Sequence, residues 1–236
     1  MELKNIFKME IYKNCNDKPY LLVIAILTAM AAASTFLSIA TEHGLSVTLI
    51  VLIIFTVLGL GVFSLLYPFH LLNVDYKNKV MSLIFASGVS REKYYFVKIS
   101  ATILTCLIAM LAILIIPIIT FLLVYPEIFV EMMQEIFNNF NFSDIAPLAL
   151  MSIFSWLAYF VTLTTSVIIT KGKVAGIFLF FGFSFIVSIF QTSFSFPLLA
   201  SMDGFSAYFN LVTVFSIIQI VVFVLIGLNV LRKQDL

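Results

Sequence analysis

Few side chains in this sequence are of the types that carry out covalent, redox or metal chemistry. The only histidines are His43 and His70, and the only cysteines are Cys15 and Cys106. Residues so far apart form no recognisable metal-ligand pattern. The phosphate-loop pattern G-x-x-x-x-G-K-[ST] and the hydrolase patterns H-E-x-x-H and G-x-S-x-G do not occur. We therefore expect no catalytic residue, no metal and no cofactor bound by this chain.

A second group of polar residues lies inside long apolar segments. Five of them are candidates for lining a substrate path: Ser184, Gln191, Asn210, Thr213 and Gln219. Uncharged polar residues in membrane helices commonly hold helices together by hydrogen bonds and close packing. The other interpretation is the weakly polar wall of a translocation path. Asn210 and Gln219 lie in one segment but do not share a helix face, so the pattern supports that path only weakly.

The elements that must position these residues follow from composition. Hydrophobic residues make up 62% of the 236 residues and charged residues 11%. A soluble domain is about half apolar and a quarter charged. The apolar residues form segments of the length that a bilayer-crossing helix needs, about 20 residues. We expect an all-α integral membrane protein with one transmembrane domain, 1–236, and six spans, at 20–40, 47–72, 97–125, 146–170, 174–196 and 207–231.

The basic residues alternate between the connections of these six segments. Loops 41–46, 126–145 and 197–206 carry no Lys or Arg. The 13 basic residues are Lys4, Lys8, Lys13 and Lys18, then Lys77, Lys79, Arg91, Lys93 and Lys98, then Lys171 and Lys173, then Arg232 and Lys233. Because Lys and Arg concentrate on the cytoplasmic side of membrane proteins, this alternation predicts that both termini and loop 73–98 are cytoplasmic.

Two further features refine this expectation. Residues 2–14 place Leu3, Ile6 and Phe7 on one helical stripe, which predicts an amphipathic helix at the membrane interface. The spans hold no Asp, Glu, Lys or Arg well inside the membrane, where ion-coupled carriers usually keep one. A secondary carrier is therefore the less favoured interpretation. Nucleic acid is not an expected partner, because no basic tract with interleaved aromatic residues occurs.

Loop 73–98 is the longest basic loop and has its own helical pattern. Val80, Leu83 and Ile84 form a short stripe, and Gly88 suits a helix C-terminus because it takes positive φ without a Cβ penalty. Ser90 suits the N-cap of a following helix. The loop is therefore predicted to be a helix, a glycine turn and a helix that continues into the third span. Such an elbow is either a contact for a cytoplasmic partner or a surface turn without one, and the physical pattern leaves both open.

The same loop resembles the connection between the second and third spans of ABC-2 type permeases, the membrane subunits of bacterial ABC exporters. That family has a segment of the form leu-leu-x-x-pro-val-ser-arg-x-x-tyr, followed by a lysine at the start of the next span. Val89, Ser90, Arg91 and Tyr94 match this segment, and Lys98 matches the lysine. Gly88 replaces the more usual proline. The layout of an amino-terminal amphipathic helix and six spans is also similar, whereas 191–206 has room only for short turns where many relatives have re-entrant helices.

The resemblance implies a mechanism and partners. Two permease copies, identical or related, would pair in the bacterial plasma membrane above two separate ATPase subunits, which would bind ATP and Mg²⁺. The loop would be the coupling helix that contacts the ATPase, and its candidate contact residues are Lys77, Lys79, Ser82, Leu83, Ser87, Gly88, Ser90 and Arg91.

The function expected from these observations is ATP-driven export of a hydrophobic or amphipathic substrate, with a peptide as the favoured cargo. The alternative is a non-transporting membrane subunit that binds a peptide for immunity or sensing. An adjacent gene for a stand-alone ATPase would favour export.

Overall fold

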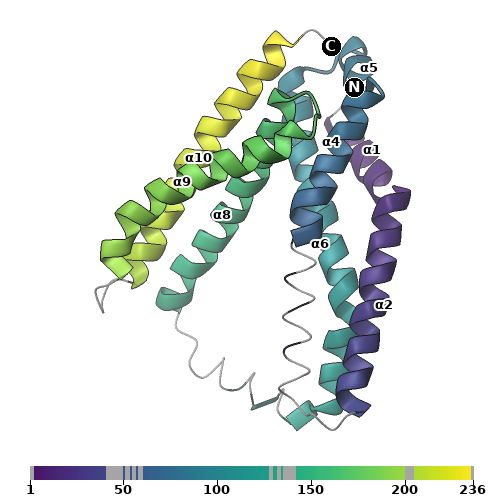
Figure 1. Ribbon diagram of the computed structural model, residues 1–236, viewed down its shortest axis with the longest axis vertical. Helices are drawn as coiled ribbons and strands as arrows, with labels where there is room; N and C mark the ends of the chain where they lie inside the picture. The colour runs from purple at the N-terminus through teal and green to yellow at the C-terminus, as the bar shows by residue number, and fades with distance from the viewer. Residues whose placement is uncertain are drawn as a thin grey trace. The chain divides into compact units, whose positions relative to one another are not determined.

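The structure is a computed structural model that describes residues 3–40, 61–127, 142–199 and 205–234, together with positions 50, 54, 57, 130, 131 and 134. Every secondary-structure element in these described residues is helical (Figure 1). The helices are α1 (Leu3–Cys15), α2 (Lys18–Ala40), the π-helix η1 (Val62–Leu66), α4 (Tyr67–Lys77), α5 (Val80–Ala86), α6 (Arg91–Val124), α8 (Phe142–Ile169), α9 (Ala175–Leu199) and α10 (Phe205–Lys233).

Five of these helices are long and apolar enough to cross a membrane, and they coincide with five of the six predicted spans. They cover Lys18–Leu37, Arg91–Ile116, Ile145–Ile169, Ala175–Ser195 and Ala207–Lys233. The predicted span 47–72 lies largely outside the described residues, and its last part, 61–72, is helical. Helix α9 occupies the first part of the predicted turn 191–206, as far as Leu199. Residues 200–204 lie outside the described residues.

Helix α6 is longer than a bilayer crossing requires. Its 34 residues span about 51 Å at 1.5 Å per residue. A bilayer core is about 30 Å thick. One end of α6 must therefore extend beyond the core, and the charged residues at Arg91, Glu92 and Lys93 identify that end.

The chain divides into two compact units, whose boundaries fall at the start of α4 and inside α6. One unit contains 68–99 and 141–236, and the other contains 2–67 and 100–140. The prediction of one transmembrane domain is not tested by this division and stays a prediction.

In the unit that contains the first helices, two tyrosine side chains connect neighbouring helices: Tyr20 joins α2 to α6, and Tyr67, at the start of α4, joins it to α1. The Tyr20 hydroxyl donates to the Thr105 carbonyl oxygen at 2.8 Å, and the Tyr67 hydroxyl donates to the Asn14 carbonyl oxygen at 2.8 Å. The two tyrosine rings pack with their centroids 4.6 Å apart. Helix α1 forms where the sequence predicts it, and Ile6, which the sequence places on the apolar stripe of an interfacial helix, is buried inside the protein.

The buried face of α1 is more polar than its predicted apolar stripe. Glu10 and Asn14 are fully buried, and with Ile6 they stand at i, i+4 and i+8. Their spacing puts all three on one helix face. The stripe of Leu3, Ile6 and Phe7 therefore describes the buried face incompletely.

In the other unit, α8 packs against α9 and α10, as Figure 1 shows in green and yellow. Hydrogen bonds cross between α8 and α10: Gln219 Nε2 donates to Thr162 Oγ1 at 2.9 Å, and Thr165 Oγ1 donates to the Phe223 carbonyl oxygen at 3.0 Å. The Tyr95 hydroxyl lies 3.0 Å from Thr165 Oγ1 and brings α6 to the same point. Polar side chains therefore hold these membrane helices together, as the packing interpretation of such residues expects.

Gly227 makes this junction possible. A Cβ atom at Gly227 would lie 2.9 Å from Thr165 Oγ1 and 3.0 Å from the Tyr95 ring. We predict that Gly227→Ala destabilises the protein by about 1–3 kcal/mol through overpacking, seen as a lower melting temperature in detergent. Gly182→Ala is the matched control, because a Cβ there meets nothing within 4 Å. Equal melting temperatures for both variants would contradict this account of the junction.

Candidate functional site

Loop 73–98 forms the helix, glycine turn and helix that its sequence predicts. Helix α5 ends at Ala86, Gly88 adopts φ 85°, and α6 begins at Arg91. Ser90 Oγ accepts the Lys93 backbone N–H at 3.4 Å, as an N-cap side chain does. Lys79 precedes α5 in a left-handed conformation with φ 54°. The short helix α5, the glycine turn and the start of α6 are therefore present, and their role in coupling stays a prediction.

Helix α5 has one buried and one exposed apolar side chain. Met81 is 1% exposed, whereas Leu83 is 69% exposed. The serine hydroxyls bond locally, Ser82 Oγ to the Lys79 carbonyl oxygen and Ser87 Oγ to the Ile84 carbonyl oxygen, both at 2.7 Å. Lys77 and Lys79 are exposed. Leu83 and the two lysines are therefore open to solvent, as are Ser87, Gly88 and Ser90.

Arg91 has a role inside the chain. Its Nη1 donates to the carbonyl oxygens of Leu231 and Arg232, each at 2.6 Å, and its guanidinium lies 5.6 Å from the Phe85 ring centroid. The last carbonyls of a helix lack partners within the helix, and a cation suits that end of the helix dipole. Arg91 therefore caps the C-terminus of α10. Its predicted contact with an ATPase is not tested.

A buried ion pair connects α4 with α6 on either side of α5. Lys98 Nζ lies 2.5 Å from Asp75 Oδ2, and the two side chains are 1% and 0% exposed. The Tyr94 hydroxyl donates to the same Asp75 oxygen at 3.1 Å, and the Tyr94 ring meets the Phe85 ring of α5 edge to face. A buried charge is tolerated when it is paired and hydrogen-bonded. This pair therefore fixes the base from which α5 projects.

A second set of bonds connects the end of the described chain to α4 and α8. The Tyr76 hydroxyl donates to Gln234 Oε1 at 3.0 Å, and Gln234 Nε2 donates to the Ile168 carbonyl oxygen at 2.7 Å. Burial raises the pKa of the Tyr76 hydroxyl above its usual value. The hydroxyl therefore keeps its proton at physiological pH and acts as a donor. The last turn of α10 is held by both Arg91 and Gln234.

A cavity beside α5 lies next to the ion pair. Its volume is about 330 Å³, and it is lined by Asp75, Tyr76, Lys79, Met81 and Ser82. Two of the predicted coupling residues, Lys79 and Ser82, therefore lie at one cavity with the buried acid.

Three of the five predicted path residues come together in the membrane-spanning part of the same unit. Ser184, Gln191 and Gln219 line a hollow of about 160 Å³ between α8, α9 and α10. Its other lining residues are Ser155, Tyr159, Val187, Ser188 and Ser216. Asn210 and Thr213 are not among them, and the Thr213 hydroxyl bonds to the Phe209 carbonyl oxygen of its own helix. The role of Asn210 and Thr213 in a substrate path stays a prediction.

Sequence reasoning missed the pairing of Asp75 with Lys98. Both residues belong to loop 73–98, whose positive charges and helical pattern do not indicate which acid meets which base. The sequence does contain a signal for this pair. Asp75 follows the apolar segment 47–72, and Lys98 stands at the start of the apolar segment 97–125. Within the part of the chain that the structure describes, no cluster of His, Cys, Asp and Glu is suited to a metal.

Comparisons with protein-family models, with curated proteins and with solved structures give no match for this chain.

The buried pair makes a stability prediction. Asp75→Asn leaves the Lys98 charge buried without its counter-charge, so we expect a loss of about 3–5 kcal/mol, measured by thermal or denaturant unfolding in detergent. Lys98→Met should cost a similar amount, and the double variant should cost much less than the sum of the two.

Glu92→Gln is the matched control, because it breaks the Glu92–Arg232 pair, whose side chains are half exposed. An exposed pair contributes about 0–1 kcal/mol. If Asp75→Asn costs no more than Glu92→Gln, the Asp75–Lys98 pair does not hold α4 and α6 together.

Proposed function

We propose that this chain is the membrane subunit of an ATP-driven exporter, in which a separate cytoplasmic ATPase supplies the energy through α5 and its flanking residues. The observation that carries the proposal is the short helix α5, which exposes Leu83 beside Lys77 and Lys79 and stands on the buried Asp75–Lys98 pair. The resemblance of 79–94 to the ABC-2 permease loop supports the same role.

The contacts of this segment suit the transmission of force. An exposed apolar side chain on a helix is the kind of residue that inserts into a groove of a partner protein. Displacement of α5 would act on α4 and α6 through Asp75, Lys98 and Tyr94, and on α10 through Arg91. A packed and hydrogen-bonded contact passes on displacement because interiors are closely packed and resist compression. Three of the membrane helices would thus respond to one cytoplasmic contact.

The remaining parts of the proposal concern arrangement in the membrane. The chain would cross six times with both termini in the cytoplasm of a bacterial cell, with α1 at the inner membrane surface. A second copy or a related subunit would complete the permease. The hollow of Ser184, Gln191 and Gln219 supports a path for an amphipathic substrate, such as a peptide, because it offers hydrogen-bonding groups inside an apolar layer. A non-transporting immunity or sensor subunit is the alternative.

Coupling is tested by reversing charge on the exposed face of the segment. We expect Lys79→Glu and Leu83→Glu each to abolish most of the substrate-stimulated ATP hydrolysis of the complex with a candidate ATPase, because they place an acid in the proposed contact. Lys93→Glu is the matched control, since Lys93 is exposed in the same loop but lies on α6. Arg91 is unsuitable for this test because its substitution would also uncap α10.

Two results would count against the proposal. Complex formation and stimulation that are unchanged in both Lys79→Glu and Leu83→Glu would exclude this segment as the coupling contact. The second result is a complex with the ATPase that forms but neither transports a substrate nor changes its ATP hydrolysis in response to one. That result would favour the immunity or sensor function.

Orientation is tested separately by cysteine labelling. In a variant lacking Cys15 and Cys106, we expect Lys79→Cys and Lys171→Cys to react with a membrane-impermeant maleimide only after the membrane is opened. Val130→Cys, an exposed position in the predicted outer loop, should react in intact cells. Labelling of Lys79→Cys and Val130→Cys from the same side would refute the six-span arrangement.

A further inference from the structure

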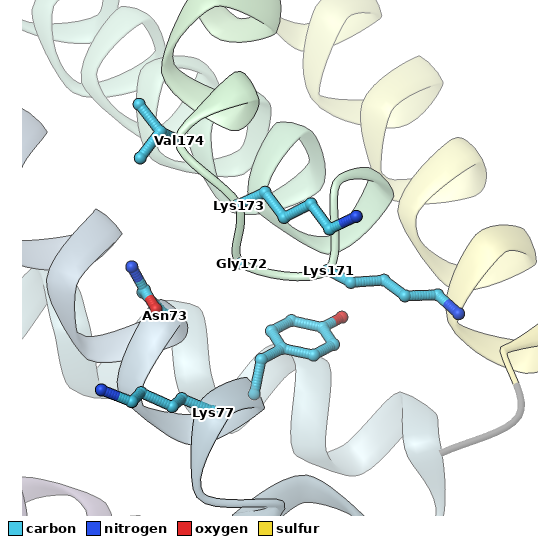
Figure 2. A pocket seen from close by; sticks show the side chains of 7 residues that line it. Asn73, Lys77, Lys171, Gly172, Lys173 and Val174 are labelled. Carbon is cyan, nitrogen blue, oxygen red and sulfur yellow. The ribbon is translucent and has the colours of Figure 1, made fainter.

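A cavity with three lysines lies where the hairpin of α8 and α9 meets α4. Its volume is about 580 Å³, and Figure 2 draws its seven lining residues and labels six of them. Lys171, Gly172, Lys173 and Val174 come from the hairpin turn, and Asn73, Tyr76 and Lys77 come from α4. Binding cavities for small ligands commonly measure about 300–1,000 Å³, so this one has room for a headgroup-sized ligand.

The charge of this cavity has one sign. None of its seven lining residues is acidic, and within the described part of the chain no ion pair is recorded for Lys77, Lys171 or Lys173. Figure 2 shows Lys171 and Lys173 on the turn and Lys77 on the opposite wall. In Figure 2 the Lys77 side chain extends in a different direction from those of Lys171 and Lys173, so the three lysines line the hollow from two sides without their ammonium groups meeting. An anion in the hollow would be attracted by each of them.

The turn is held at this place by close packing. A Cβ atom at Gly172 would lie 3.1 Å from the Asn73 Cα and 3.1 Å from the Tyr76 Cβ. Gly172 also adopts φ 75°, a conformation that suits glycine. The Tyr76 hydroxyl is bonded to Gln234, so the ring is a fixed wall. The backbone N–H groups of Lys171, Gly172 and Lys173 all bond within the turn, so an anion would be held by side chains.

The position of the cavity indicates where its ligand comes from. Helices α8 and α9 both have the length and composition of membrane spans, so the turn between them lies at the membrane surface. Val174, at the rim, is 61% exposed, which gives the cavity an apolar edge beside its charges. A charged group joined to an apolar chain matches such a lining, and basic pockets between membrane helices bind anionic headgroups.

We propose that Lys77, Lys171 and Lys173 form a binding site for a phosphate group, carried by an anionic phospholipid at the membrane surface. The site is distinct from the proposed transport function, which does not depend on it. The lysines also lie near the C-termini of α4 and α8, where cations are favourable for the helix dipole. Stabilisation of the helix ends alone would affect stability but would give no selective binding. A binding measurement therefore separates this role from that of a phosphate site.

The test measures protection of individual lysines. The protein is placed in phosphatidylcholine nanodiscs with or without phosphatidylglycerol, and amine labelling is followed residue by residue by mass spectrometry. We expect phosphatidylglycerol to slow labelling of Lys171 and Lys173 several-fold while leaving Lys4 and Lys8, which are also exposed, unchanged. Inorganic phosphate in phosphatidylcholine nanodiscs is the second arm.

The two arms identify the source of the phosphate group. Protection by phosphatidylglycerol alone assigns a lipid headgroup, and protection by both probes assigns a general phosphate site open to soluble ligands. Protection by neither probe, or equal protection of Lys4 and Lys8, overturns the proposal, because diffuse attraction to a charged membrane would then explain the result.

Variants supply an independent measure, the apparent Kd for dihexanoyl-phosphatidylglycerol from native mass spectrometry. Lys171→Gln with Lys173→Gln should weaken binding about tenfold or more, given roughly 1 kcal/mol per lysine near an anionic surface. Lys4→Gln with Lys8→Gln removes the same charge elsewhere and should have no effect. Gly172→Ala keeps every charge but displaces the turn, so it should also weaken binding. Equal weakening by the two double variants would contradict a defined site.

Discussion

The contact between Asp75 and Lys98 is the constraint on which the rest of this unit depends. Both side chains are buried, and the carboxylate also accepts the Tyr94 hydroxyl. Burying two charges is costly unless their geometry and hydrogen bonds compensate for lost hydration. The buried pair therefore says little about the net stability of the protein, but it does determine where the two helices lie. It brings the end of α4 to the start of α6 and leaves α5 projecting from the junction.

Several other contacts concentrate at the same end of the unit. Arg91 caps α10, Gln234 bonds to the end of α8, and Gly172 packs against α4. Each of these contacts joins a helix terminus to a neighbour by a specific polar or close-packed group. The membrane-spanning parts of α8, α9 and α10 are connected by the bonds of Gln219 and Thr165 and by the packing of Phe183 against Phe223.

The sequence predicts what depends on local pattern. Five spans follow from hydropathy, and the elbow follows from Gly88 and Ser90, because a positive φ and an N-cap are local requirements. It does not predict which charges meet, since Asp75 and Lys98 are joined only by the fold of the intervening loop. For the same reason the sequence does not predict the intrachain bonds of Arg91. The sequence also groups Asn210 with Gln191, although the two do not share the hollow. The buried polar face of α1 was missed because an apolar stripe does not reveal which polar neighbours are also covered.

The central claim is that the elbow and the end of α10 form one cooperative structure based on the buried pair. Native-state hydrogen exchange of the wild type and of Asp75→Asn tests it most directly, because local unfolding is resolved segment by segment. The account predicts that amides of α5 and of residues 228–234 gain exchange together in Asp75→Asn, while those in the middle of α9 do not change. Faster exchange confined to α5, with 228–234 protected as in the wild type, would contradict it.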